Sequence, residues 1–317
     1  QLVQLADQSP EPAHLLEADY LFGIAAFWGG EFALARQHLE AMLARYDPAQ
    51  HGDLVFCYGE DPRIQPVFYH VLTLWIMGDA DQARRQHQVA LSHAQAVASP
   101  HNLAFALNFS AIFHLCCREV SLVHTQAESE IDLATEQGFP HWIGAGTTFR
   151  GWARVVQGEG EEGIAELHQG LSVYQATGAQ AGGTWLRALL AEAYGHRGQP
   201  ETGRQVLAEA REDMEGRGER VYEAELYRLQ GDLLLRQAIP DTLQAEACFQ
   251  QALDIARQQL AKSWELRVAL SLSRLWQQQG KRDKARELLA PLYGGFTEGF
   301  DSADLQETKV LLDELRA

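Results

Sequence analysis

Apolar residues recur at helical spacing along most of this chain, and the pattern is clearest between residues 223 and 259. Four leucines of the first half fall on one face of a helix: Leu226, Leu229, Leu233 and Leu234. Gly231 lies between them, and Ala245, Phe249 and Ala252 follow at spacings of four and three residues. Small residues at a close helix crossing, with an aromatic side chain between them, are typical of the tetratricopeptide repeat.

The same periodicity predicts antiparallel helix pairs along the chain. The expected pairs are 14–28 with 31–46, 63–77 with 80–97, 101–117 with 121–137, 140–157 with 161–177, 184–197 with 201–215, the two halves of 223–259, and 264–279 with 282–293. A final helix is expected over 303–315. The helix expected over 31–46 ends at Asp47, because a residue before proline avoids the α region. Residues 47–62 then form an irregular connector. Its apolar centre, 54–58, is expected to pack against the first helix pair.

A small residue opens most of the predicted second helices. The positions are Ala83, Gly163, Gly203, Ala245 and Ala285, at intervals of 80, 40, 42 and 40 residues, and Val123 fills the missing place. A period of about 40 exceeds the 34 of the common tetratricopeptide repeat and overlaps the 40–47 of HEAT repeats. The Ala–Phe–Ala pattern and the short glycine turns favour packing of the tetratricopeptide kind.

The predicted fold is therefore all-α, a right-handed superhelical solenoid of about seven helix pairs with a C-terminal capping helix. We expect one domain over 1–317, with a first helix pair and connector (1–62), regular repeats (63–293) and a cap (294–317). Such an array buries its core by stacking neighbours, so its usual product is a binding surface.

Adding 40 to a position gives residues expected on the same face of successive helices. Three rows result: Phe68, Asn108, Thr148, Ala188 and Arg228; Gln65, Phe105, Ala145, Trp185 and Glu225; Leu72, Ile112, Trp152, Glu192 and Asp232. The residues expected to contact a partner on the concave face are Phe68, Asn108, Thr148, Trp152, Trp185, Glu192, Arg228 and Asp232. The alternative is that the aromatic members belong to the core and the polar members are merely solvated.

Charge and composition narrow the classes of partner. The chain has 43 acidic against 26 basic residues, a formal charge of −17, and no run of four basic residues. This field repels phosphate, which argues against nucleic acid and anionic membranes as partners. No apolar run approaches the roughly 20 residues of a membrane span. The start shows no secretory signal and no initiator methionine, which suggests a fragment of a longer protein.

The cysteines point to a reducing compartment. Cys57, Cys116, Cys117 and Cys248 form no C-x-x-C pair, and the last three stand in apolar helical context, where a free thiol fills the core. A cytoplasmic location is therefore expected.

Motifs for catalysis are weak. Residues 158–163 (GEGEEG) match G-x-G-x-x-G, but a helix precedes them and their glutamates would repel phosphate. Gly158 is better interpreted as a helix C-cap and Gly163 as a crossing residue. The glycines of 144–148 lack the lysine of a P-loop, and the histidines do not cluster at metal-ligand spacing. We therefore predict no catalytic residue, no metal site, no cofactor and no enzymatic activity.

Several segments resemble one family. They are 189–195 (LLAEAYG), 222–231 (YEAELYRLQG), 245–252 (AEACFQQA), 265–276, 279–291 and 293–301 (YGGFTEGFD), and 27–32 and 134–140 also fit. Nearly the whole chain resembles the C-terminal tetratricopeptide-like region of large bacterial signalling proteins. These fuse a class III adenylate or guanylate cyclase, a kinase or a DNA-binding module to a STAND-type ATPase, and MalT-like activators share the architecture more distantly. Gly295 departs from the pattern, which has tryptophan there.

The resemblance implies a regulatory or sensor tail without catalytic residues. The expected function is a non-enzymatic scaffold that binds a protein or peptide, which includes another domain of the same polypeptide, and regulates an attached ATPase or cyclase. The alternative is a small-molecule sensor that holds a sugar or other metabolite near Trp152 and Trp185. The oligomeric state stays open.

Overall fold

A computed structural model describes residues 12–52, 61–97 and 99–316. Its regular elements there are sixteen helices, with no strand. They pair as α2 (Pro12–Trp28) with α3 (Phe32–Arg45), α6 (Ile64–Met77) with α7 (Ala80–Ala96), α8 (Pro100–Cys116) with α9 (Val120–Gln137), α10 (Pro140–Gln157) with α11 (Gly160–Ala176), α12 (Gly183–His196) with α13 (Pro200–Arg217), α14 (Glu223–Leu235) with α15 (Thr242–Gln258), and α16 (Lys262–Gln278) with α17 (Arg282–Gly294). A last helix, α18 (Ala303–Arg316), packs on α16 and α17. The expected helix bounds agree within two residues.

The connector after the first pair begins with α4 (Pro48–His51), a single helical turn. The Asp47 side chain caps this turn by accepting a hydrogen bond of 2.9 Å from the backbone N–H of Ala49. Residues 54–58, and Cys57 among them, lie outside the described residues, so their packing stays a prediction.

Glycines allow a close helix crossing between α10 and α11. A Cβ built on Gly151 would lie 2.7 Å from the carbonyl oxygen of Gly163, and one on Gly163 would lie 2.6 Å from that of Gly151. Gly144 and Gly170 meet in the same way about two helical turns from Gly151 and Gly163. Gly158 ends α10 at a φ of 103°, the left-handed region that favours glycine. The packing and capping interpretations of these glycines are confirmed.

Gly231 is a glycine because the Phe249 ring occupies the place of its side chain. A Cβ on Gly231 would lie 2.5 Å from the Phe249 ring, which fills the space between α14 and α15. Ala83, Ala245 and Ala285, which mark the period in the sequence, are fully buried.

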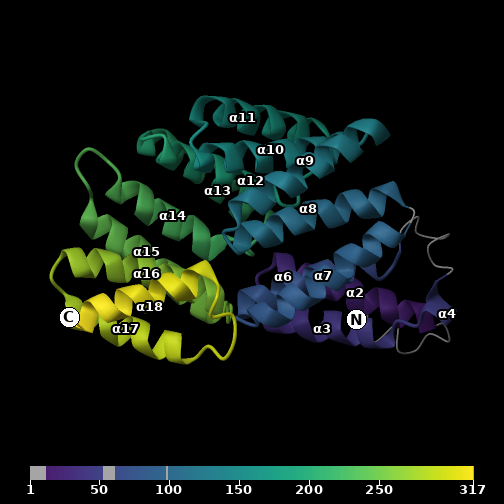
Figure 1. The fold of residues 1–317 in the computed structure, drawn as a ribbon, viewed down its shortest axis with the longest axis horizontal. Coiled ribbons are helices and arrows are strands. Elements are labelled where there is room, and N and C mark those ends of the chain that lie inside the picture. The colour runs from purple at the N-terminus through teal and green to yellow at the C-terminus, as the bar shows by residue number, and fades with distance from the viewer. Residues whose placement is uncertain (1–11, 53–60, 98, 317) are drawn as a thin grey trace.

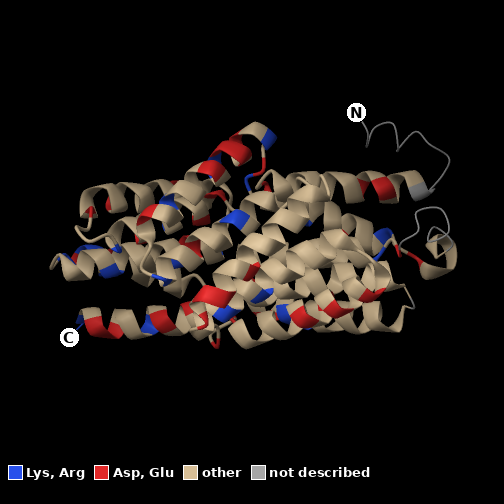
Figure 2. Ribbon diagram, turned by 90° about the horizontal axis from the view of Figure 1, so that it is seen from above, with Lys and Arg blue, Asp and Glu red and all other residues tan. Residues whose placement is uncertain are grey.

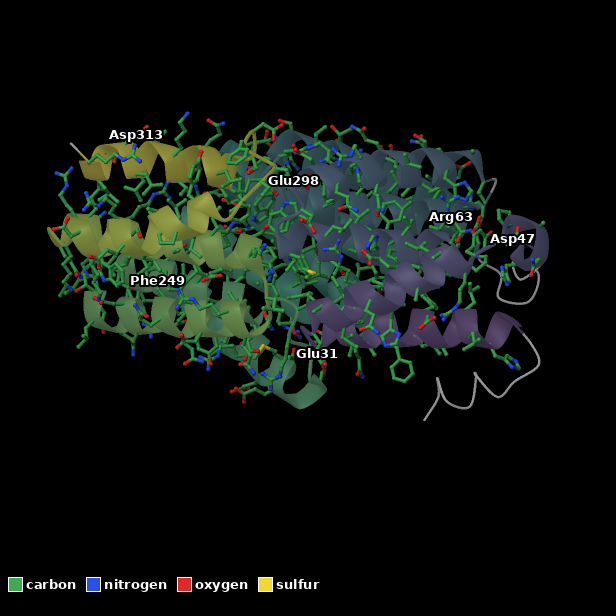
Figure 3. The ribbon with its side chains drawn as sticks, turned by 90° about the horizontal axis from the view of Figure 1, so that it is seen from below. Glu31, Asp47, Arg63, Phe249, Glu298 and Asp313 are labelled. Atoms are coloured by element: carbon green, nitrogen blue, oxygen red, sulfur yellow. The ribbon has the colours of Figure 1, made fainter. Side chains whose placement is uncertain are left out.

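The helix pairs follow a curved path that returns on itself (Figure 1). From α2 and α3 they lead up to α10 and α11, and then down to α17 and α18. The start of α16 lies beside α6, and the loop between α17 and α18 lies beside the start of α7. Trp75 of α6 meets Trp264 of α16 with ring centroids 4.8 Å apart, and the Ser263 hydroxyl donates to the Trp75 carbonyl. Glu298, labelled in Figure 3, accepts bonds of 3.0 and 3.1 Å from the first free N–H groups of α7. We call these contacts the closure.

A third contact closes the array on another side. The carbonyl oxygen of Trp28, at the end of α2, accepts hydrogen bonds from the backbone N–H groups of Arg220 and Val221, at 2.7 and 3.2 Å. The first helix pair thus touches the segment before α14, about 190 residues later in the chain. The first helix of each pair therefore turns its inner face toward a common interior.

Charge is distributed unevenly around this interior. Helices α6 and α8 contain no Asp, Glu, Lys or Arg, whereas α14 and α16 carry charges of both signs. Figure 2 shows the same contrast, with charged residues gathered toward the C-terminal half. None of the described helices combines the length and apolarity that a membrane crossing requires.

We expect Gly163→Ala to lower the free energy of unfolding by about 1–3 kcal/mol, because the new methyl group overlaps backbone atoms of α10 that cannot move aside cheaply. Gly216→Ala is the matched control, since nothing lies within 4 Å of its Cβ position on the exposed face of α13. It should be neutral or stabilising by up to about 1 kcal/mol. Urea unfolding measures both, and an equal effect of the two substitutions would contradict the crossing argument.

Candidate ligand-binding interior

Two cavities open on the interior, at opposite ends of the same inner helices. The first, the aromatic cavity, has a volume of about 280 Å³. Its rings come from Trp28, Tyr69, Phe105, Phe109, Trp142, Phe149, Tyr174 and Trp185. Helices α8, α10 and α12 supply five of these eight rings, and the α11–α12 linker, 179–182, completes the wall.

The aromatic cavity is uncharged. None of its lining residues is Asp, Glu, Lys or Arg. Burial lowers the pKa of His141, and the nearby His101 lowers it further, so the imidazole is neutral at pH 7. Burial raises the pKa of Tyr174 to about 12, and its hydroxyl donates to the carbonyl of Ala181 in the linker. The Trp28 indole N–H donates to the Tyr69 hydroxyl at 3.3 Å.

A buried carboxyl group orients the amide that faces this cavity. The Asn108 Nδ2 donates to Oε1 of Glu130 on α9 at 2.9 Å. Glu130 is fully buried, and this burial raises its pKa well above the ordinary value, against the opposing effect of the Asn108 hydrogen bond. The neutral carboxyl is the favoured form, since no cation pairs with it among the described residues.

The second, the charged cavity, has a volume of about 470 Å³. The ends of α8, α10 and α12 form one side, and α14, α16 and α18 form the other. Five arginines and five carboxylates line it: Arg118, Glu192, Glu225, Arg228, Asp232, Arg236, Arg267, Arg274, Asp304 and Glu307. The numbers balance, so the cavity offers both signs of charge to a ligand.

Its floor is a buried ionic network. The Arg228 guanidinium donates two hydrogen bonds to Glu225, at 2.8 and 2.9 Å, and another to Asp232. Burial alone would lower the pKa of Arg228, but the attraction of Glu225 and Asp232 outweighs this effect and raises it. Burial raises the pKa of Asp232 in spite of Arg228. Arg267 approaches Glu225 at 3.7 Å and donates to Asp304 at 2.6 Å.

The rim of the charged cavity holds groups that a ligand can reach. The Trp152 indole N–H donates to Glu192 at 2.8 Å, which joins two helix pairs at positions 40 residues apart. Arg236 is exposed and donates to the Gly195 carbonyl at 3.4 Å, without an ion pair among the described residues. Glu192 and Asp232 are half-buried beside it.

A stacked pair of rings separates the two cavities. Trp185, in the wall of the aromatic cavity, lies against Tyr222, in the wall of the charged cavity. Their centroids are 4.5 Å apart and their planes differ by 20°. Tyr222 in turn meets the edge of Trp264, one of the rings of the closure.

The structure places the eight expected contact residues in three environments. Asn108 and Trp185 line the aromatic cavity. Four line the charged cavity: Trp152, Glu192, Arg228 and Asp232. Phe68 and Thr148 line neither and are fully buried, which corrects the expectation that they face a partner. Phe68 packs edge-on against Phe105 and Phe109, and the Thr148 hydroxyl donates to the carbonyl of Gly144.

The correction follows from helix geometry. Successive residues are rotated by about 100°, so Phe105 and Ile112 lie about 60° and 40° to the same side of Asn108. Both line the aromatic cavity, and the centre of the interior face is therefore about 50° from the row that contains Phe68 and Thr148. That row points mainly toward the second helix of its own pair.

Sequence reasoning missed three residues that shape the charged cavity. Arg267 lies 39 residues after Arg228, one position off the expected row. Asp304 belongs to α18, which has no counterpart in the repeats. Tyr222 precedes α14 by one residue, where helical periodicity gives no signal.

Metal-binding and thiol chemistry have little support in the described residues. No group of three His, Cys, Asp or Glu side chains there is arranged to hold a metal ion. Cys116, Cys117 and Cys248 are free thiols, and burial raises the pKa of Cys117 to about 12. A thiol with a raised pKa is a poor nucleophile at neutral pH.

Comparison with known proteins identifies the fold. No family model matches the chain, and no curated protein matches it. A Rap protein complexed with competence and sporulation factor superposes with a TM-score of 0.61 at 15% identity, over 95% of this chain and 80% of that one. NprR in complex with its cognate peptide NprX superposes with a TM-score of 0.55 at 12% sequence identity, over 95% of this chain and 82% of NprR. A STAND protein with a tetratricopeptide repeat sensor, from Pyrococcus horikoshii, superposes with a TM-score of 0.50 at 12% sequence identity, over 99% of this chain and 48% of that protein.

At such identities the likeness concerns the fold alone. The expected all-helical, tetratricopeptide-like solenoid is confirmed. The chain spans about half the length of the STAND protein.

We expect Glu130→Gln to raise the free energy of unfolding relative to the native chain, by an amount that grows as the pH rises above about 5. The folded state keeps a proton that the unfolded chain releases above the ordinary pKa of 4.5, so the native chain loses up to about 1.4 kcal/mol per pH unit until Glu130 ionises in the folded state. Glutamine keeps the acceptor for Asn108 and does not titrate. Denaturant unfolding at several pH values measures the difference.

Glu136→Gln, on the exposed face of the same helix, is the control and should show no such growth. A difference between Glu130→Gln and the native chain that shrinks with rising pH would mean that Glu130 is ionised in the folded state.

Proposed function

We propose that this chain is a non-enzymatic regulatory repeat domain that binds a peptide segment in the charged cavity. The observation that supports it is the arrangement of that cavity, whose ionic floor is fixed by buried pairs while Glu192 and Arg236 stand at the rim. Its volume lies within the roughly 300–1,000 Å³ of typical ligand sites.

The chemistry of the rim suits a peptide better than a simple ion. A peptide offers backbone donors and acceptors along its length, together with charges of either sign at its ends and side chains. Arg236 can take a carboxylate, while Glu192 can take an ammonium or guanidinium group. Because the floor charges are already paired with each other, little reorganisation accompanies binding.

The solved neighbours support the same class of partner. NprR is described in complex with its cognate peptide, and the Rap protein with competence and sporulation factor. A protein partner or another domain of the same polypeptide fits the rim chemistry when it inserts an extended segment. The formal charge of −17 argues against nucleic acid and anionic lipid.

The regulatory part of the proposal concerns an attached signalling module. A ligand shifts an equilibrium only by its different affinities for two states. The closure is the element that would respond, because the charged cavity is bounded by α8 and α10 on one side and by α16 and α18 on the other. Peptide binding would favour one separation of these sides, and an ATPase or cyclase in the same cytoplasmic polypeptide would respond to it.

A second candidate function is small-molecule sensing, and the aromatic cavity favours it. The structure divides the two tryptophans first considered for such a site, since Trp185 lines the aromatic cavity and Trp152 the charged one. A sugar does not suit the aromatic cavity, because few of its lining groups can satisfy buried hydroxyls.

Thermal-shift screening of the folded chain against charged and neutral metabolites tests small-molecule sensing, because a ligand of the folded state raises the melting temperature.

Peptides selected by the folded chain from a display library of random twelve-residue sequences should bind less tightly to Glu192→Gln and Arg236→Ala. Each substitution removes one charge from the rim, so we expect the Kd to rise by about five- to thirtyfold. Fluorescence anisotropy of labelled peptides measures the Kd.

Glu201→Gln is the matched control, since Glu201 is exposed on α13 and lines neither cavity. It should leave the Kd unchanged. The proposal fails if no peptide is selected, or if the selected peptides bind both rim variants as tightly as the native chain.

A further inference from the structure

The aromatic cavity is built for a ligand of a different kind from a peptide. Its wall has no ionised side chain, and a charged group that entered it would lose its hydration without a partner of opposite sign. The charged cavity begins beyond the Trp185–Tyr222 stack. The occupant of the aromatic cavity is therefore neutral.

The volume limits the size of this occupant. An apolar cavity of about 150 Å³ holds one benzene molecule. The aromatic cavity, at about 280 Å³, has room for a body of about two fused rings. Flat rings are favoured because the wall is itself aromatic, and aromatic pairs gain from stacked and edge-on contacts.

One polar group in the wall lacks a partner. Trp185 is 4% exposed, and its indole N–H is buried without a hydrogen bond to any described residue. The Trp28 indole in the same wall is satisfied by Tyr69. Buried indole N–H groups usually find an acceptor, and Trp185 belongs to the cavity wall, so a ligand with an acceptor group would supply the missing partner.

We propose that the aromatic cavity binds a small neutral molecule with a flat body of about two rings and one hydrogen-bond acceptor, which the Trp185 N–H recognises. This inference rests on the second candidate function, small-molecule sensing, and gives it a site and a ligand class. The sugar considered from the sequence falls outside that class.

Three probes of nearly equal shape test the ligand class: 1-indanone, which has a carbonyl acceptor; indane, which has none; and 1-aminoindane, which is a cation at neutral pH. Saturation-transfer NMR with the folded chain, followed by titration, measures their binding. We expect 1-indanone to bind about three- to tenfold more tightly than indane, the value of one neutral hydrogen bond. The cation should not bind detectably.

Two substitutions locate the site. Trp185→Phe keeps a ring against Tyr222 and removes the N–H, so the affinity for 1-indanone should fall to that for indane. Ala145→Phe, in the wall formed by α10, fills the cavity and should abolish binding of both. Trp264→Phe is the control, because the Trp264 N–H is also buried without a partner among the described residues but does not line the cavity. Circular dichroism and urea unfolding establish that each variant is folded.

The proposal is overturned if 1-indanone does not bind, if indane binds equally well, or if folded Trp185→Phe keeps the preference for the carbonyl. These results are distinguishable from failure of small-molecule sensing as such. A charged metabolite that raises the melting temperature, and does so less in Glu192→Gln, would preserve the sensing function and place it in the charged cavity.

Discussion

The guanidinium of Arg267 joins parts of the chain on which the shape of the interior depends. It pairs with Asp304 of α18 and donates to the Cys116 carbonyl at the end of α8, at 2.6 and 2.7 Å. It also lies over the rings of Trp75 and Trp264, 5.4 and 5.1 Å from their centroids. Each half of the array contributes to this one cluster, and both the closure and the charged cavity border on it.

Burial makes this interaction demanding. Removing a charge from water is costly, and a buried pair offsets the cost only with close geometry and further hydrogen bonds. Burial would raise the pKa of Asp304, but Arg267, assisted by Arg118, lowers it below the ordinary value. Loss of one partner from such a pair costs roughly 3–5 kcal/mol, whereas a wrongly formed contact leaves the other charge unpaired. A buried pair is therefore weak evidence of net stability, although its geometry penalises an arrangement that leaves either charge unpaired.

The local rules of the fold were accessible from the sequence. Helical periodicity and glycine turns predicted the helix pairs, and Gly163, Gly231 and Ala245 marked the crossings because a side chain there meets a neighbouring helix directly. The 40-residue period also placed Trp152 and Glu192 on the same face of successive inner helices, where they form a hydrogen bond. These features depend on contacts within a pair or between neighbours, and such contacts leave a regular signal.

The interior was only partly predictable. The centre of the interior face lies about 50° from the row first chosen, which is why Thr148 of that row is buried while Phe105 and Ala145 of the neighbouring row line the cavity. The closure depends on the curvature accumulated over the whole array, and its residues, such as Ser263 and Glu298, lie outside the rows that the 40-residue period defined. The division into an uncharged and a charged cavity likewise arises only when α14, α16 and α18 meet the ends of α8 and α10.

The closure has a consequence for how the chain fluctuates. In an open array each repeat touches only its neighbours, so the end repeats fray first and protection from hydrogen exchange declines toward both ends. Here α7 has its first N–H groups capped by Glu298, and Trp28 accepts bonds from the segment before α14. Because these contacts hold both end regions of the array, the first and last repeats should not open before the others. Their protection from hydrogen exchange should resemble that of the middle repeats. Contacts so distant in sequence also slow folding, because a long loop must close before they form.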